Sequence, residues 1–349
     1  EFENPDGLGW FNCKNRVTSI GQVFRDITCP EDGDWAKPAL IQRQNLSVMG
    51  GSGGLTYAIS GRYSDEGVPL DGSGIGYGAS SQFQPMDDRV GYNKDKGVRA
   101  NFTMEFTPTL RAEWTSSLSL IDQKWSPSGA GSFQAFNAPM QRGFRGAVQV
   151  GGEPAAGLHF SQSDNMDKRR QVVTGFTVSH IPSDWFDHRL AIGYDLNVIE
   201  AAHFQHVGNV MRPTGYYNQS NFEARTTTFD YGLNLRTEIM GMSSTTSSGF
   251  QAYREFSRNT AFRIRDFPGP VDKPTLVAGA DQTIRSDESL EVVNAGMYLQ
   301  QVFGFGDVFF LTGGLRVDGN SAFGSGFGLQ AYPKLSGSFV VSDMDFWTS

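Results

Sequence analysis

The chain has 349 residues, which is enough for two ordinary domains or for one large all-β unit. Charged residues make up only 19%, below the roughly 25% of ordinary soluble domains, whereas 42 glycines and 13% aromatic residues suit β-structure with many turns. The net charge of −8, without clustered Lys and Arg, argues against a nucleic-acid partner.

The N-terminus carries no recognisable targeting signal. Residues Glu1 to Trp10 contain no basic region followed by an apolar core, and the chain does not begin with Met. We therefore expect a piece of a longer protein that forms one partial domain over 1–349, with a loop-rich segment at 1–43. No run approaches the roughly 18 uninterrupted apolar residues of a spanning helix, which excludes helical membrane proteins but not membrane barrels.

Two cysteines, Cys13 and Cys29, stand 16 positions apart in a turn-rich segment. A disulfide between them would close a loop and could stabilise it by roughly 3 kcal/mol in an oxidising compartment. Two unpaired thiols remain the alternative. Two cysteines without a nearby His do not complete a tetrahedral metal site, so no metal is expected.

The main pattern along the chain is period-2 alternation, which sends successive side chains of a strand to opposite faces. It begins at 55–64, where Leu55, Tyr57, Ile59 and Tyr63 share one face. Residues 98–107 and 110–120 alternate in the same way on either side of Pro108. This arrangement predicts a hairpin with a very short turn.

The alternation returns through the second half of the chain. Residues 172–178 and 186–197 flank the turn Pro182-Ser183-Asp184, and further runs lie at 228–236, 309–318 and 334–341. The segment 249–256 alternates poorly and predicts a strand only weakly. About eleven strands are expected, many close to the roughly 9–11 residues that a tilted strand needs to cross a bilayer.

The predicted connections alternate between short and long, as in an outer-membrane barrel with periplasmic turns and external loops. The short ones are Gly51–Gly54, Pro108, Pro182–Trp185, Ser243–Ser248, Phe305–Asp307 and Ser342–Asp345. The long ones are 65–97, 122–170, 199–225, 259–290 and 319–331. A soluble sandwich would show more turn signals at spacings of about 8–12 residues, and a solenoid would show a sequence repeat, which is absent.

In a membrane barrel the apolar face must contact lipid, so the polar face lines a wet interior. Charged residues of both signs lie on that polar face, and they are the candidates for contact with a solute or a polar plug. The lumen-facing candidates are Arg99, Glu105, Arg111, Glu113, Arg189, Arg316 and Asp318.

Several segments resemble barrel segments of SusC/RagA-like TonB-dependent receptors. The most specific is Phe310–Gly324 with its continuation Tyr332–Ser336. Shorter matches are Gln44–Val48, Leu55–Tyr57, Ile59–Gly61, Asn294–Gly296 and Phe303–Phe305. The resemblance implies an antiparallel transmembrane β-barrel of about 22 strands that encloses a plug, of which this chain would form an incomplete part with open edges.

The same resemblance implies the partners. They are the TonB-ExbB-ExbD energy-coupling system, a SusD-like surface lipoprotein, outer-membrane lipid and an imported ligand. The implied function is active import of a bulky nutrient, an oligosaccharide or a peptide, at the bacterial outer membrane. A passive porin-like channel and a soluble β-rich binding module remain the alternatives.

Other candidate chemistry is weak, and neither enzyme activity nor a cofactor is expected. His203 and His206 could share a metal, but they fall in a predicted external loop without a third ligand. The glycines at 72–78 lack the Lys-Ser/Thr of a phosphate loop, and the acidic pair at 87–88 is expected to be solvated. Aromatic residues in the long loop are the candidates for ligand contact, namely Trp125, Phe133, Phe136 and Phe144.

Overall fold

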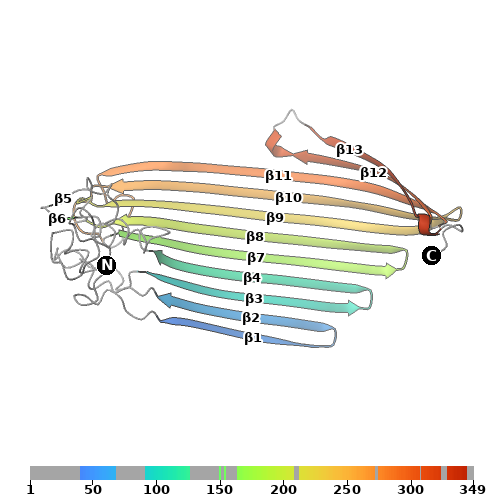
Figure 1. Cartoon of the computed structure of the whole chain (residues 1–349), viewed down its shortest axis with the longest axis horizontal. Coiled ribbons are helices and arrows are strands. Elements are labelled where there is room, and N and C mark those ends of the chain that lie inside the picture. The colour runs from blue at the N-terminus through green and yellow to red at the C-terminus, as the bar shows by residue number, and fades with distance from the viewer. Residues whose placement is uncertain are drawn as a thin grey trace, which may run out of the picture.

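A computed structural model shows a large antiparallel sheet that contains most of the described residues (Figure 1). It describes residues 40–67, 91–125, 149–150, 153–154, 163–207, 212–271, 274–306, 308–323 and 328–343. Eleven strands lie in the order β1-β2-β3-β4-β7-β8-β9-β10-β11-β12-β13, so each strand pairs with its neighbours along the chain. The predicted fold class and strand number are therefore confirmed.

The sheet strands differ widely in length. They are β1 (Ile41–Ser52), β2 (Leu55–Gly67), β3 (Tyr92–Thr107), β4 (Leu110–Trp125), β7 (Ser163–Ser183), β8 (Phe186–Gln205), β9 (Tyr216–Ile239), β10 (Met242–Arg265), β11 (Asp281–Phe305), β12 (Phe309–Asn320) and β13 (Gln330–Phe339). A separate two-stranded ribbon pairs β5 (Gln149–Val150) with β6 (Glu153–Pro154), and two 3-10 turns are η3 (Ser321–Phe323) and η4 (Val341–Asp343). Within these described residues, β1 and β13 do not pair with each other, so the sheet is open at both edges.

The strands are longer than predicted, since they run from 10 residues in β13 to 25 in β11. Each predicted long loop is correspondingly shorter, and β1 already begins at Ile41, inside the segment 1–43 for which loop was expected. The reason is that strand pairing continues beyond the membrane. Both faces of a strand are wet there, so pairing persists while the apolar alternation that marks a strand in the sequence disappears.

One predicted turn is wrong. The sequence favours a connection at Ser243–Ser248, but β9 turns into β10 through Met240 and Gly241, whose φ angles are 53° and 75°. Two successive residues with positive φ form the turn whose twist matches that of a hairpin. Gly permits this conformation readily but Met does not, which is why the sequence gives little warning of the turn.

The remaining expectations on connections agree better with the structure. The turns at Gly53-Gly54, after Pro108 and before Phe186 lie where they are predicted. The weakly predicted segment 249–256 lies inside β10, which pairs with β9 on one side and β11 on the other. Val341, expected at the end of the last strand, lies in η4 instead.

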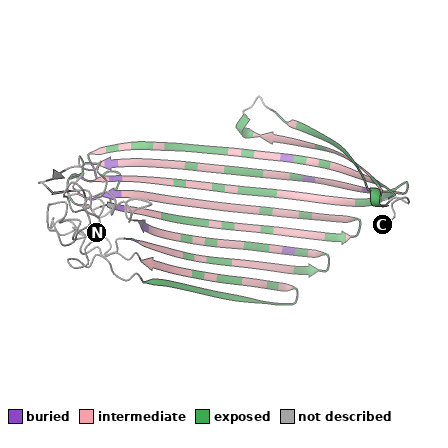
Figure 2. Cartoon of the chain, viewed as in Figure 1, coloured by how far each residue is buried: buried purple, intermediate pink, exposed green. Residues whose placement is uncertain are grey.

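The register places apolar side chains of neighbouring strands in shared rows on one face. One such row joins Leu55, Met104, Ala112, Val178 and Leu190 across β2, β3, β4, β7 and β8. Many large apolar side chains of this face are exposed, including Ile192 at 42% and Trp114 at 43%. The described strands form a single layer, with no second sheet packed on this face, as Figure 2 shows by the exposed positions along the strands.

The largest fully buried side chains among the described residues lie at the strand ends next to the long loops. Phe204 and Ile264 are fully buried there, and Tyr217 and Phe267 complete the cluster. Phe267 follows β10, and its backbone N–H donates to the carbonyl of Thr214, which fixes the returning chain over the strand ends. In the described residues no helix is long and apolar enough to cross a bilayer.

Candidate functional site

The sheet brings all seven predicted lumen candidates to one face, opposite the exposed apolar residues. Glu105, Arg111 and Arg189 share one row of the register, with Ser179 between the last two. Glu113 and Asp318 belong to the next row, two residues further along each strand. Arg316 belongs to the row of Arg189, which continues through Gly232, Gly249 and Tyr298. Arg99 lies on the same face, six residues before Glu105 on β3. We refer to this surface as the polar face.

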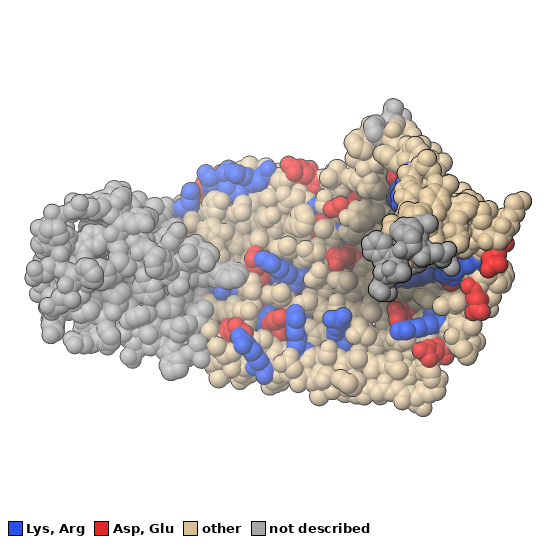
Figure 3. All heavy atoms as spheres, turned by 45° about the vertical axis from the view of Figure 1, so that its right-hand side comes forward, with Lys and Arg blue, Asp and Glu red and all other residues tan. Residues whose placement is uncertain are grey.

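Charges on the polar face occur mostly as pairs of opposite sign. Arg111 and Glu113 form an ion pair on β4, and Arg62 of β2 approaches Asp95 of β3 to 3.1 Å. Figure 3 shows such blue and red side chains next to each other, separated by uncharged surface and reaching the end of the sheet that carries the short turns. The surface is therefore strongly polar but locally balanced in charge.

The most connected group is a chain of four side chains drawn from β9, β10 and β12. The Gln251 side-chain amide donates to Asp230 Oδ2 at 2.6 Å, and its carbonyl oxygen accepts from Arg316 Nη1 at 2.8 Å. Arg316 Nε lies 2.9 and 2.8 Å from the two carboxylate oxygens of Asp318. The guanidinium is thus held between an amide and a carboxylate, which fixes its plane.

A glycine makes this arrangement possible. Gly296 of β11 lies opposite both Gln251 and Asp318 in the register, between the strands that carry the group. A Cβ atom at Gly296 would overlap the Asp318 carboxylate and would lie 3.0 Å from Arg316 Nη2. The missing side chain therefore leaves the space in which the Arg316 and Asp318 side chains lie across β11.

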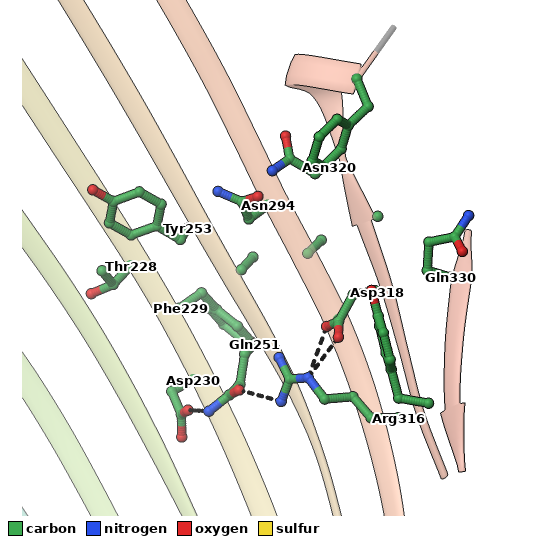
Figure 4. Close-up of a pocket in the computed structure, with 16 residues that line it drawn as sticks. Thr228, Phe229, Asp230, Gln251, Tyr253, Asn294, Arg316, Asp318, Asn320 and Gln330 are labelled. Carbon is green, nitrogen blue, oxygen red and sulfur yellow. Dashed lines mark hydrogen bonds and ion pairs between the residues drawn. The ribbon is translucent and has the colours of Figure 1, made fainter. Parts of the chain in front are cut away.

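An open pocket of about 520 Å³ lies at the same place, as Figure 4 shows. Asp230, Gln251, Arg316 and Asp318 line it from one side, and Asn294 adds a further amide. Tyr253 and Tyr332 supply aromatic surface to the same pocket. Such a combination can accept hydrogen bonds, donate them and contact an apolar group, which suits a polar ligand or a polar protein segment.

Sequence reasoning missed Gln251, although this residue connects Asp230 to Arg316. It lies in the segment 249–256 whose alternation is poor, so no face could be assigned to it. Only its position opposite Asp230 could have identified Gln251 as a member of this group. In the register Gln251 lies directly opposite Asp230, but that pairing follows from the turn at Met240-Gly241, which the sequence places wrongly.

The two histidines considered for a metal site have other roles. His203 lies in β8, not in a loop, and its Nδ1 contacts Asn165. His206 is 7% exposed and its Nε2 lies 2.8 Å from Asp164, so the expectation of a solvated loop is wrong for it. Among the described residues, no group of three or more His, Cys, Asp or Glu side chains could hold a metal.

The predicted loop contacts and the cysteines are largely beyond what the structure describes. Trp125 is the last residue of β4, so it ends a strand where a loop was expected. Phe133, Phe136, Phe144, Cys13 and Cys29 lie outside the described residues, as do the glycines at 72–78 and the acidic pair at 87–88. Ligand contact by the aromatic residues and the disulfide stay predictions.

Similar folds are found among solved structures. The RagAB peptide transporter matches with a TM-score of 0.61 at 14% identity, over 88% of this chain and 35% of that chain. The RagAB peptide importer in its 'open-open' state gives 0.62 at 14% identity, with 90% and 36% covered. The FpvAI–pyocin S2 complex gives 0.50 at 12% identity, with 87% and 40% covered. The chain thus spans about a third to two fifths of the length of these structures.

A search of curated protein sequences gives no match to this chain. The family model described as TonB dependent receptor-like, beta-barrel, in contrast, matches residues 42–348. This range covers all eleven strands of the sheet except the first residue of β1. The chain therefore belongs to the TonB-dependent receptor β-barrel family of the bacterial outer membrane.

Proposed function

We propose that this chain forms part of the wall of a receptor that imports a bulky nutrient, an oligosaccharide or a peptide, across the outer membrane. The observation that carries the proposal is the two-faced sheet, with exposed apolar rows on one side and the polar face with its pocket on the other. Such a wall separates hydrocarbon from a wet interior. RagAB, whose fold is similar, is described as a peptide transporter, which supports a peptide as one candidate.

Membership of the family supports energy coupling by TonB-ExbB-ExbD. The resemblance of residues 310–324 and 332–336 to SusC/RagA-like receptors supports a SusD-like lipoprotein as the surface partner. In this proposal the strand ends next to the long loops lie outside the cell, where they contact the lipoprotein and the ligand. The polar face contributes positioning contacts, and no covalent step is involved.

Uptake by cells that carry the complete receptor tests the proposal. We expect cells to accumulate label from either a labelled protein digest or a labelled polysaccharide hydrolysate. This accumulation should stop when TonB is deleted. The physical reason is that accumulation against a gradient requires energy, which the outer membrane receives only through such coupling. A passive porin would instead allow entry of the same labelled pool at the same rate with and without TonB.

The lumen candidates are proposed to contact the solute or a plug, and Arg111 with Glu113 offers a clean test. We expect the double variant Arg111→Gln, Glu113→Gln to lower uptake by roughly two- to five-fold, the size of one or two partly solvated charge contacts. Net charge is unchanged and both side chains are half exposed, at 52% and 42%, so folding should not suffer. Initial uptake rate and ligand affinity are measured.

The matched control is Arg254→Gln, Glu291→Gln. This pair joins β10 and β11 at 2.9 Å, and it is exposed to a similar degree, 60% and 47%, on the opposite face of the sheet. Uptake should remain at the wild-type rate in the control. Equal uptake in both double variants would remove Arg111 and Glu113 from the solute path.

A further inference from the structure

Above the apolar rows, the outward face carries basic side chains without acidic partners. Here outward face means the face opposite the polar face. Lys96 of β3 and Arg170 of β7 both lie opposite Leu120 of β4, one on each side. Both are exposed. Their backbones are two strand spacings apart, which is about 10 Å.

The surface immediately toward the turns is apolar. Val98, Leu118 and Val172 form the adjoining row on β3, β4 and β7. Val98 is 53% exposed and Leu118 is 40% exposed, and Leu120 between the two cations is 37% exposed. The cations thus lie where the lipid-facing surface ends on the side of the long loops. In the orientation of outer-membrane barrels, this is the level of the headgroups of the outer leaflet.

Several other basic residues on the outward face pair with carboxylates, but Lys96 and Arg170 do not. Arg225 pairs with Glu223, Arg254 with Glu291 and Arg258 with Asp287. In the described part of the chain, no carboxylate lies within ion-pair distance of Lys96, Lys168 or Arg170.

The acidic residues nearest to this site along the outward face belong to the next row. Asp122 lies opposite Lys94 and Lys168, and it accepts a hydrogen bond from the Tyr92 hydroxyl. Asp65 and Glu200 flank the same row on β2 and β8. On β2, β4 and β8 the row with Lys96 and Arg170 contains Tyr63, Leu120 and Val198, none of which is charged. The row continues beyond Val198 to Glu223 of β9, which Arg225 neutralises.

We propose that Lys96 and Arg170 form a binding site for the phosphate groups of an outer-leaflet glycolipid of the lipid A type, whose acyl chains lie along Val98, Leu118 and Leu120. Long basic side chains reach from an apolar surface to the polar boundary of a bilayer. Arg binds phosphate with a fork of donors and Lys with a point charge. The exposed apolar row next to the two cations favours a ligand that carries acyl chains over a dissolved anion.

The test uses the complete receptor in mixed micelles, with lipid A as the probe and native mass spectrometry as the readout. We expect Lys96→Gln, Arg170→Gln to bind lipid A about ten-fold more weakly than wild type, since each basic residue near an anionic surface contributes a factor of several. Lipid A from which both phosphates have been removed should bind wild type as weakly as intact lipid A binds the variant. Equal thermal unfolding of variant and wild type shows that the fold is intact.

The control is Arg43→Gln, Arg169→Gln. These residues lie on β1 and β7, are exposed at 64% and 48%, and face the polar side, where they pair with Glu66 and Asp167. The control removes the same charge and should bind lipid A as wild type does. The proposal is overturned if Lys96→Gln, Arg170→Gln binds normally, if the control loses as much affinity, or if inorganic phosphate displaces lipid A at equal concentration.

Discussion

Ile192→Arg is expected to destabilise the complete barrel by about 2–4 kcal/mol, the cost of an Arg near the middle of the bilayer on the lipid-facing side of a barrel. Ile192 lies on the apolar face of β8, midway between Phe186 and Val198, and is 42% exposed. In the register it lies between Phe176 and Phe229 of the neighbouring strands. Reversible unfolding by urea in lipid vesicles measures the change.

The neighbouring residue supplies the control, because adjacent residues of a strand point to opposite faces. Ala191 lies on the polar face between Thr177 and Asp230. Ala191→Arg places the same charge one residue away, in a wet interior near a carboxylate, and should change stability by less than about 1 kcal/mol. If Ile192→Arg were equally harmless, the apolar face would not contact hydrocarbon, and the membrane orientation of the sheet would be wrong.

The alternation that assigns these faces was readable in the sequence only where lipid lies on one side. In β8 it holds from Phe186 to Leu196, and the strand then continues to Gln205. β11 shows the same limit, since its first nine residues, from Asp281 to Ser289, include only one apolar residue, Ile284. Backbone pairing holds such segments in the sheet, and it leaves no mark on the order of side chains. The number of strands could therefore be predicted, but not their length.

The candidate site was predictable in part for the same reason. Arg316 and Asp318 alternate with Leu315 and Val317, so their face followed from the pattern. Gln251 did not, because its contacts depend on which residue of β9 lies opposite. A register is set by the turn, and a shift of one residue would exchange the two faces. The Met240-Gly241 turn therefore had to be known before Gln251 could be assigned to Asp230.

The buried cluster at the long-loop ends was also invisible in the sequence, because its members come from five separate parts of the chain. Lys124 is the last residue but one of β4, Asp164 is the second residue of β7, and His206 follows β8. The His206 ring packs against Phe204, with ring centres 4.1 Å apart, and so joins the ion pair to the apolar cluster that includes Ile264. The ion pair and the apolar cluster together form a buried layer, which connects the strand ends next to the long loops.

Asp164→Asn is expected to destabilise this layer by about 3–5 kcal/mol, the cost of removing one partner of a buried ion pair. Lys124 Nζ lies 2.9 Å from Asp164 Oδ1, and both side chains are only 6% exposed. The second carboxylate oxygen contacts His206 Nε2 at 2.8 Å. Without the carboxylate, the ammonium of Lys124 remains in a site with little water. Hydrogen exchange at the ends of β4, β7 and β8 in the complete receptor measures the loss.

The effect of Asp164→Asn should depend on pH in a defined direction. Asp164 lies eight residues beyond Val172 on the same face of β7, past the charged residues Lys168 and Arg170, and so outside the lipid-facing part of the strand. Burial acts to raise the pKa of Asp164, but the hydrogen bond with His206 and the charge of Lys124 together outweigh it, so the pKa lies below its usual value. A carboxylate with a lowered pKa contributes fully above about pH 4 and loses its contribution as the pH falls through the folded-state value. Wild type and variant should therefore differ fully at neutral pH and converge in acid.

Asp167→Asn is the control for this contribution. Asp167 lies three residues further along β7 and approaches Arg169 to 3.6 Å, but this pair is solvated, with Arg169 at 48% exposure. Exposed pairs contribute at most about 1 kcal/mol, so exchange at the strand ends should be nearly unchanged. Each variant removes one carboxylate from the same strand, so the loss of charge is the same in both. A difference in hydrogen exchange between them therefore measures the effect of burying the ion pair. If the Asp164 and Asp167 variants exchanged alike, the Lys124–Asp164 pair would be accessible to water and would not stabilise the ends of these strands.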